Sequence, residues 1–321
     1  MSEVARPPVS DIAVVVPTYR RPGSLGRLVA ALEAQTLDKE RFEVVIVDDG
    51  SADDTDATLH ALAATTSLRL TPLRFDYNRG QAAARNLGWA ATTTPFLAFI
   101  DDDCVPEPTW LQAGLDALSA EPQTGVVQGC TKRPAGPTTD WTVFREVLQP
   151  SPWFEGCNLF ARRRALEQVG GFDESMRRGG EDTMVGWAIL AGGWRRAFAD
   201  GAVVWHDNDE RGLGYHVRYG WREGVICKVA RRYPAFRREG LWRPWAVRPL
   251  NVAYCVALIG VVLGVSWRRQ LLALVLPYAW MRRPPRGHDR YLRLAAERLA
   301  VDTAVFAGMK AGAAREHQLI V

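Results

Sequence analysis

The sequence predicts an α/β protein with a Rossmann-like, mostly parallel wound sheet and helices on both faces. Two observations predict this fold. Short apolar runs alternate with helical patterns along the first half of the chain, and several of these runs end in polar clusters. Such alternation is typical of right-handed β–α–β units. Because loops after parallel strands emerge at one edge of a sheet, we expect the polar clusters to share one crevice.

The first half of the chain supplies four expected strands separated by helices. Apolar runs predict buried strands at residues 12–16, 42–47, 68–75 and 96–100. After the first run, Pro22 begins a segment with leucines at helical spacing, and residues 53–62 and 81–91 predict two more helices. Polar clusters follow the first, second and fourth of these strands.

The second half has a more mixed pattern. Further strands are expected at residues 124–128, 157–161, 195–199 and 202–205. The last of them leads into His206, and a helix is expected to run from Glu181 to the glycine pair at 192–193.

The run FLAFIDDDCVP, residues 96–106, is the most informative segment. Its five apolar residues predict a buried strand, and Asp101, Asp102 and Asp103 follow at the strand's carboxyl end. Carboxylates this close repel one another, so we expect a positive group among them. Hard oxygen ligands suit Mg²⁺ or Mn²⁺ holding a diphosphate. The alternative is a helix cap with solvated acids.

Six motifs together resemble family 2 glycosyltransferases with the GT-A fold. They are VVVPTYRRPGSL, VVIVDDGSADDT, NRGQAAARNLG, FIDDDCVP, GGFDE and GGEDTMVGWAILAGG. The match runs from about Ile12 to His206, roughly the first two-thirds of the chain. This resemblance implies inverting sugar transfer from a UDP-, dTDP- or GDP-linked donor to a hydroxyl of a glycan, lipid-linked or small-molecule acceptor.

The resemblance also implies a Mn²⁺ or Mg²⁺ cofactor and a catalytic base. Asp101 and Asp103 match the family's metal-binding aspartates, and His206 resembles the histidine that completes the metal shell in some relatives. Asp182 matches the acid that removes the acceptor's proton, a task that suits a carboxylate. The alternatives are a surface histidine at a strand end, and acids that favour a helix N-terminus electrostatically.

Nucleotide and acceptor contacts follow from the same resemblance. The residues expected to bind the nucleotide are Pro17, Thr18, Tyr19, Asp48, Asp49, Arg85 and Asp102. Asp49 would accept a hydrogen bond from the base, Asp102 would take a ribose hydroxyl, and Arg85 would reach the base or phosphate. The alternatives are a simple turn at Asp48 and a solvated Arg85. The residues expected near the acceptor are Trp153, Phe154, Glu155, Asp173 and Glu181.

Charge divides the chain. The formal net charge is +4, yet the 19 basic and 6 acidic residues from Leu213 onward (+13) leave 21 basic and 30 acidic residues (−9) for the rest. We expect a flexible N-terminus at residues 1–10, a GT-A catalytic domain at 11–211 and a basic, aromatic-rich helical region at 212–321. Five scattered cysteines without a C-x-x-C pair, and the absence of a leader pattern, favour a cytoplasmic protein.

The C-terminal region is expected to bind the cytoplasmic face of a membrane. Residues 252–265 and 271–281 carry no charge, and tryptophans with neighbouring arginines lie near their ends. Each run is shorter than the ~20 residues of a spanning helix, so interfacial helices or a monotopic hairpin are expected. The alternative is a helical subdomain that packs on the catalytic domain or on a dimer partner. Nucleic acid is disfavoured because the arginines alternate with apolar runs.

The sequence is less consistent with two other functions. A sugar-1-phosphate nucleotidyltransferase should carry a glycine-rich loop with Arg and Lys after the first strand, and PTYRRPGS lacks that glycine spacing. A non-catalytic nucleotide-sugar-binding protein is disfavoured because Asp101, Asp103 and Asp182 are all present.

Overall fold

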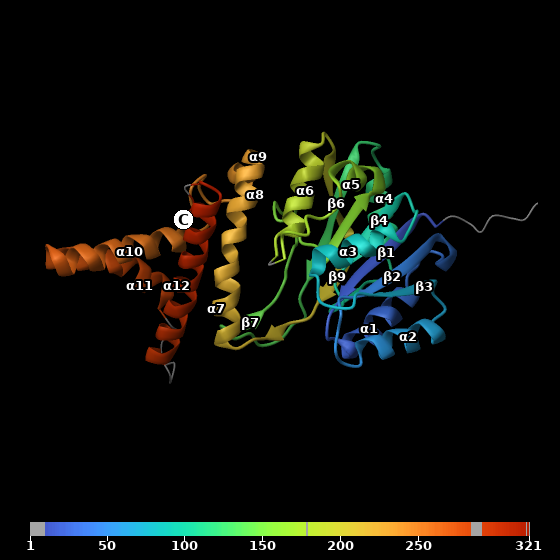
Figure 1. Ribbon diagram of the computed structural model, residues 1–321, viewed down its shortest axis with the longest axis horizontal. Coiled ribbons are helices and arrows are strands. Elements are labelled where there is room, and N and C mark those ends of the chain that lie inside the picture. The colour runs from blue at the N-terminus through green and yellow to red at the C-terminus, as the bar shows by residue number, and fades with distance from the viewer. Residues whose placement is uncertain (1–9, 178, 284–290, 319, 321) are drawn as a thin grey trace, which may run out of the picture. The chain divides into compact units, whose positions relative to one another are not determined.

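The computed structural model describes residues 10–177, 179–283, 291–318 and 320. The chain forms two compact units (Figure 1): residues 1–138 with 142–209, and residues 139–141 with 210–321. Most of the segment expected to be a flexible N-terminus, residues 1–9, lies outside the described residues.

The first unit is built on an eight-stranded sheet of order β3-β2-β1-β4-β8-β6-β9-β5. The strands are β1 (Ile12–Thr18), β2 (Phe42–Asp48), β3 (Leu70–Arg74), β4 (Phe96–Ile100), β5 (Cys104–Pro106), β6 (Thr124–Lys132), β8 (Asn158–Arg162) and β9 (Arg195–His206). Strands β1 to β4 pair in parallel with one another, whereas β8 runs antiparallel to both β4 and β6. Two short strands, β7 (Thr142–Val143) and β10 (Asp209–Glu210), lie outside this sheet. The mostly parallel α/β sheet predicted from sequence is confirmed.

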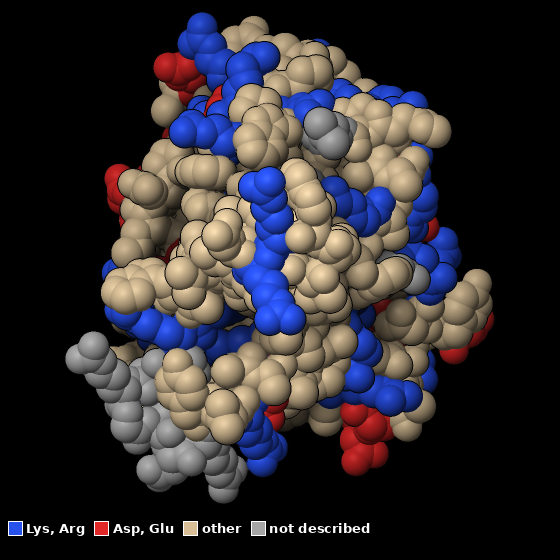
Figure 2. All heavy atoms as spheres, turned by 90° about the vertical axis from the view of Figure 1, so that its left-hand side faces the viewer, with Lys and Arg blue, Asp and Glu red and all other residues tan. Residues whose placement is uncertain are grey.

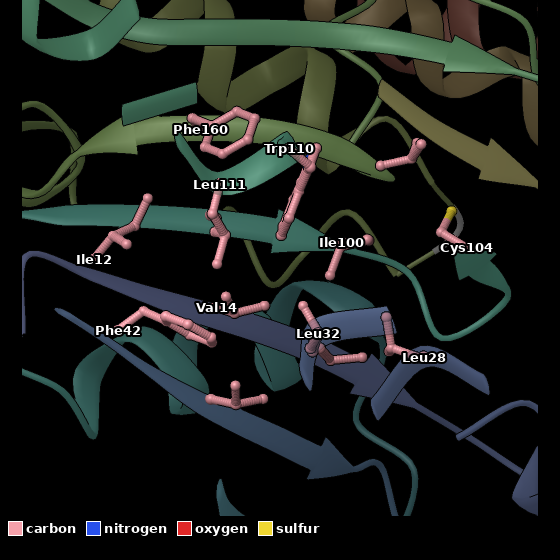
Figure 3. Packing of buried hydrophobic residues seen from close by; sticks show 14 of the residues in the cluster. Ile12, Val14, Leu28, Leu32, Phe42, Ile100, Cys104, Trp110, Leu111 and Phe160 are labelled. Atoms are coloured by element: carbon pink, nitrogen blue, oxygen red, sulfur yellow. The ribbon is translucent and has the colours of Figure 1, made fainter. Parts of the chain in front are cut away.

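Helices cover both faces of the sheet. They are α1 (Pro22–Glu33), α2 (Thr55–Thr65), α3 (Gln81–Ala90), α4 (Trp110–Ser119), α5 (Arg163–Val169) and α6 (Glu181–Ala191), with a 3₁₀ turn η1 (Lys39–Arg41). Alternate residues of β1 point to opposite faces. Val14 packs with Leu28 of α1 and Leu111 of α4 in the main core (Figure 3), while Val15 faces Gly88 of α3. Apolar burial on both faces explains why β1 is a continuous apolar run.

One strand prediction was wrong. Residues 195–199 and 202–205 form the single strand β9 rather than two strands. Asp200 and Gly201 resemble a turn, yet they fall where the register between β6 and β9 shifts, between Gly129 and Cys130. A bulge of this kind lets a strand continue through residues that would otherwise end it.

The second unit is helical. Its elements are α7 (Leu213–Arg222), η2 (Glu223–Val225), α8 (Ile226–Arg232), α9 (Pro234–Glu239), α10 (Pro249–Ser266), η3 (Arg269–Val275), α11 (Leu276–Arg282) and α12 (Tyr291–Arg315). Helix α12 approaches the backbone of the α7–α8 segment at glycines. A Cβ on Gly308 would lie 2.3 Å from the Trp221 carbonyl oxygen, and one on Gly312 would lie 2.2 Å from that of Gly224. Only glycine permits this approach.

Helix α11 is joined to α12 by a polar cluster. Asp302 of α12 is buried and accepts hydrogen bonds from Tyr278 Oη at 2.8 Å and from Arg282 Nε at 2.6 Å. Because a buried carboxylate is costly unless it is paired, these two donors fix α11 on α12.

Candidate functional site

The ends of β1, β2 and β4 are joined by hydrogen bonds, as expected for loops at one edge of a parallel sheet. The Asp49 backbone N–H donates to the Thr18 carbonyl oxygen at 2.8 Å. The buried Thr18 hydroxyl donates to Asp102 Oδ2 at 2.6 Å. The three polar clusters predicted to converge therefore do so.

Asp103 and His206 are candidate ligands for a cation. Strand β5 pairs with β9 so that Cys104 lies opposite His206, and His206 Nε2 lies 3.6 Å from Asp103 Oδ1. Ligand atoms of Asp103, Cys104 and His206 all lie within 4.8 Å of one another. Burial raises the pKa of the Cys104 thiol, which stays neutral. The carboxylate and the imidazole are thus the available donors, and they fit Mn²⁺ or Mg²⁺.

Asp101 has a different partner, the buried Arg85. Arg85 is 1% exposed; one terminal nitrogen donates to Asp101 Oδ1 at 2.8 Å and the other to Glu181 Oε1 at 2.7 Å. Burial opposes the charge of Arg85, but Asp101, Glu181 and Asp182 outweigh burial and raise its pKa. Arg85 is therefore not a solvated helix residue. Its contact with a nucleotide stays a prediction.

Asp182 lies at the start of α6 with both carboxylate oxygens oriented by backbone N–H groups. Oδ2 accepts from Gly156 at 3.0 Å and Oδ1 from Thr183 at 2.7 Å. Burial and the charge of Asp182 raise the pKa of Glu181. Asp182 is less buried than Glu181. An oriented, partly exposed carboxylate can accept a proton from a substrate hydroxyl.

The residues expected to bind the nucleotide are held by local contacts. Asp49 accepts from the backbone N–H groups of Arg79 at 2.7 Å and Gly80 at 2.8 Å. Asp48 accepts from Ser51 and shapes the turn after β2. Pro17 and Thr18 are buried, whereas the Tyr19 side chain is 37% exposed. A carboxylate has about four acceptor positions, so Asp49 keeps capacity for a ligand.

Asp102 is buried between Thr18 and Arg21. Burial raises the pKa of Asp102 to about 7, against the opposing effects of the Thr18 hydrogen bond and the Arg21 charge. Arg21 also contacts Asp103. Arg21 and Arg85 therefore supply the positive charge expected among the three aspartates. The proposed ribose contact of Asp102 stays a prediction.

The residues expected near the acceptor lie on two segments. Glu155 accepts from Ser151 Oγ at 3.1 Å and from Gln128 Nε2, and burial together with the charge of Asp182 raises its pKa. The Trp153 carbonyl oxygen accepts from Thr183 Oγ1 at 2.6 Å, which ties this segment to α6.

The other expected acceptor residues have structural partners in the described part of the chain. Asp173 accepts from the Ser175 N–H at 2.9 Å in the turn after α5. Phe154 is buried against Gly186, and Glu181 is paired with Arg85. Their contact with an acceptor stays a prediction.

Arg21 and Gly156 are functional candidates that the sequence reasoning missed. Arg20 and Arg21 follow the Thr18–Tyr19 segment, and this basic pair was the available signal. Gly156 matters through its backbone N–H and its lack of a side chain, because a Cβ there would lie 2.9 Å from an Arg85 nitrogen.

Comparison with known proteins places this geometry in a family. The model of "Glycosyl transferase family 2" matches residues 13–209. The pre-mycofactocin glycosyltransferase of Mycobacterium tuberculosis is 29% identical over 243 residues, which are 70% of this chain and 48% of that protein. The glycosyltransferase AglE of Haloferax volcanii is 30% identical over 208 residues, 61% of this chain and 66% of AglE. The chain thus spans about half the length of the curated relatives it matches first.

Solved structures share the fold. The mannosyltransferase PcManGT of Pyrobaculum calidifontis, in complex with GDP-Man and Mn²⁺, superposes with a TM-score of 0.69 at 20% identity, covering 96% of this chain and 87% of that one. Staphylococcus aureus TarS 1–349, in complex with UDP-GlcNAc, gives a TM-score of 0.52 at 17% identity, covering 96% and 92%.

Proposed function

Because the chain belongs to glycosyl transferase family 2, we propose that it is an inverting, metal-dependent enzyme that moves a sugar from a nucleoside diphosphate sugar to an acceptor hydroxyl. One observation supports this most directly: Arg85 joins Asp101, in the run that also carries Asp103, to Glu181, which precedes the oriented acid Asp182. The carboxylate of Asp103 in turn faces the imidazole of His206. Family membership also favours glycosyl transfer over the sugar-1-phosphate nucleotidyltransferase alternative.

Asp103 and His206 would hold Mn²⁺ or Mg²⁺. When bound, such an ion offsets the negative charge that builds on the departing nucleoside diphosphate. Asp101 is not within the cluster that these two residues form with Cys104, and its contact with Arg85 orients the loop that carries Asp103. Arg85 contacts only Oδ1 of Asp101, so a metal role for Asp101 would fall to its other oxygen, Oδ2.

Asp182 is the proposed base. As the acceptor oxygen attacks the anomeric carbon, the acceptor's proton moves to a carboxylate oxygen of Asp182. The new carbon–oxygen bond forms while the bond from the anomeric carbon to the diphosphate oxygen breaks, and the electron pair leaves with the nucleoside diphosphate. Attack opposite the leaving group inverts the anomeric centre. The N–H groups of Gly156 and Thr183 hold the base still, so little reorganisation is needed.

The proposal defines the donor and the acceptor by chemical class. The loops at Thr18 and Asp49 would bind the nucleotide of a UDP-, dTDP- or GDP-linked sugar, and Trp153 and Glu155 would contact the acceptor. PcManGT was solved with GDP-Man and TarS with UDP-GlcNAc, so the shared fold accommodates more than one nucleotide. A relative 27% identical over 287 residues is named N-acetylglucosaminyl-diphospho-decaprenol L-rhamnosyltransferase, which favours a lipid-linked acceptor.

The second unit supports a membrane site for that acceptor. Helix α10 is the one helix in the described residues that is long and apolar enough to cross a membrane, and 22% of its apolar stretch is buried. Val262 is 64% exposed, Val265 79% and Trp267 71%. Large apolar side chains exposed together in this way are typical of a surface that binds a partner or a membrane.

Basic residues surround this apolar surface. Arg268 lies over the Trp267 ring and Arg283 over the Trp280 ring. Figure 2 shows the face of the molecule that lies on the left in Figure 1, the side of α10. The centre of this face is mostly uncharged, and Lys and Arg lie across it and around it, with few acidic residues. Such a surface suits the anionic cytoplasmic leaflet of a membrane.

Asp182→Asn tests the mechanism. We expect turnover of the bound nucleotide sugar to fall about 10²- to 10⁴-fold, because the amide cannot accept the proton. Nucleotide affinity should stay within about twofold, since the side chain keeps its shape. Release of nucleoside diphosphate measures turnover, and a calorimetric titration measures nucleotide affinity.

Asp116→Asn is the matched control, an exposed aspartate on α4. It should keep both activity and binding. Full turnover by the Asp182→Asn variant would remove Asp182 from the mechanism.

A further inference from the structure

The guanidinium of Arg21 contacts a carboxylate of the proposed cation-binding pair. Its Nη1 contacts Asp103 Oδ2 and lies 3.4 Å from Asp102 Oδ1. The other oxygen of Asp103 faces His206 Nε2 at 3.6 Å. Asp103 therefore lies between a permanent positive charge and the imidazole that would complete the metal pair.

Arg21 should oppose a divalent cation that binds there alone. An ion held by Asp103 and His206 would lie a few ångströms from the guanidinium, and like charges at that separation repel. Water screens the repulsion only in part, because the Asp103 and His206 side chains are 15% and 12% exposed. Asp103 also has to share its negative charge between the two cations.

When a diphosphate binds together with the cation, the net effect of Arg21 on binding changes from repulsion to attraction. The diphosphate oxygens and the Asp103 carboxylate would bind the same small ion. They would therefore be neighbours, and a group that touches Asp103 can reach a phosphate oxygen. The Arg21 side chain is 35% exposed, so it has room to turn from Asp103 toward the phosphates. Guanidinium groups bind phosphate well.

We propose that Arg21 couples metal binding to diphosphate binding: it weakens the site for the ion alone and strengthens it for the ion together with the nucleotide. This inference rests on the proposed function of the site. Coupling of this kind is a reciprocal free energy, so it appears both as nucleotide-dependent metal affinity and as metal-dependent nucleotide affinity. It would keep the acidic loop from holding a metal ion without its donor.

Backbone geometry explains why Arg21, and not its neighbour, takes this role. Arg20 has a φ of 56°, in the left-handed region, and its guanidinium lies over the Tyr19 ring at 5.1 Å. The left-handed residue lies in a bend between β1 and Pro22, the first residue of α1. Arg21 therefore contacts the acidic loop.

The experiment compares Arg21→Met with the unmodified protein. The affinity for Mn²⁺ in the absence of nucleotide is measured by the loss of the electron paramagnetic resonance signal of the free ion. Affinities for UDP, GDP and dTDP are measured by calorimetry in saturating Mn²⁺. We expect Arg21→Met to bind Mn²⁺ alone about fivefold to tenfold more tightly and the nucleotide at least about fivefold more weakly. Arg21→Lys, which keeps the charge but not the fork of donors, should lie between the two proteins.

Arg27→Met is the matched control. Arg27 lies on α1 and pairs with Asp207, an exposed carboxylate next to His206, so it reports the effect of removing any nearby positive charge. Equal tightening of Mn²⁺ binding in Arg27→Met, or unchanged Mn²⁺ affinity in Arg21→Met, would refute the role of Arg21. Absence of Mn²⁺ binding in every protein would refute the metal dependence in the proposed function, and the coupling with it.

Discussion

Arg85 is the residue on which the arrangement of the site depends most. It is buried in α3, and its two terminal nitrogens hold Asp101 after β4 and Glu181 at the start of α6. Its Nε has no hydrogen-bond partner among the described residues. Burying this charge is compensated mainly by the carboxylates around it, so the interaction orients the acids rather than adding net stability.

Arg85→Met should lower the free energy of unfolding by about 3–5 kcal/mol at pH 7, because the buried Glu181 and the partly buried Asp101 lose their counter-ion. Burial already raises the pKa of Glu181, and the loss of Arg85 should raise it further. When the pKa of Glu181 is higher in the folded protein than in the unfolded chain, protonation stabilises the folded protein. The contribution of Glu181 to the free energy of unfolding is therefore fully present below the ordinary pKa of 4.5 and is lost as the pH rises through the raised pKa. The deficit should therefore grow from acid to neutral pH.

Urea unfolding at several pH values measures this deficit. Arg163→Met is the control, because Arg163 donates mainly to backbone carbonyl oxygens and the Thr92 hydroxyl. A deficit in Arg85→Met that does not change with pH would contradict the role of Arg85 as the counter-ion of the two acids.

Residue roles were predictable where a motif carried them and less so where side-chain packing decided. The Asp101–Asp103 run marked the site because three acids after a buried strand are unusual. The choice of Asp103 over Asp101 as the partner of His206 was not predictable, because it depends on the pairing of Cys104 with His206. The contacts of Arg21 were equally hidden, since the sequence does not distinguish it from Arg20.

At the scale of elements, glycines set how closely helices approach the sheet. Gly114 of α4 lies over Phe160 of β8, where a Cβ would be 2.1 Å from the ring. Gly26 of α1 has nothing within 4 Å of the same position. Both glycines lie within helices, so alanine changes helix propensity in the same way at each position. A difference between the two variants therefore reports the packing of Gly114 against Phe160.

Gly114→Ala should lower the free energy of unfolding by about 1–3 kcal/mol, because the methyl group displaces a buried ring. Gly26→Ala should raise it by up to about 1 kcal/mol through helix propensity. Urea unfolding of the two variants measures both effects. Equal effects of the same sign would mean that α4 does not pack on β8 as described.

Elements with a strong local pattern were predictable. The strand at residues 96–100 and the helix start at Gln81 were predicted at the observed positions. The bounds of α12 within the helical region expected at 212–321 were not predicted, because its apolar residues are interleaved with charges and its close approach to the α7–α8 segment depends on Gly308 and Gly312. Long-range backbone contacts of this kind leave little periodic signal in the sequence.

At the scale of the whole molecule, charge and apolar surface gather in the second unit. The excess of 13 basic residues from Leu213 onward is carried by the part of the chain that also exposes the apolar side chains of α10. Electrostatic attraction and apolar insertion act together on anionic membranes.

The protein should float with vesicles that contain phosphatidylglycerol and less well with vesicles of phosphatidylcholine alone, and salt should weaken the binding. Replacing both Val262 and Val265 of α10 with Asp should lower vesicle binding at least about tenfold, because two exposed apolar side chains no longer insert. Vesicle flotation measures the bound fraction.

Tyr77→Asp is the control for this prediction, since Tyr77 is 68% exposed in the first unit. It should leave vesicle binding unchanged. Unchanged binding by the Val262/Val265 double variant would contradict insertion of α10 and favour a protein partner for that surface.

The measurement that tests the central claim most directly is a calorimetric titration with UDP, GDP and dTDP, each with and without Mn²⁺. A site formed by Asp103, His206 and the loops at Thr18 and Asp49 predicts binding of one nucleotide that depends on Mn²⁺. That result would also restrict the donor to one group of nucleotide sugars. Failure of all three nucleotides to bind in the presence of Mn²⁺ would contradict the account.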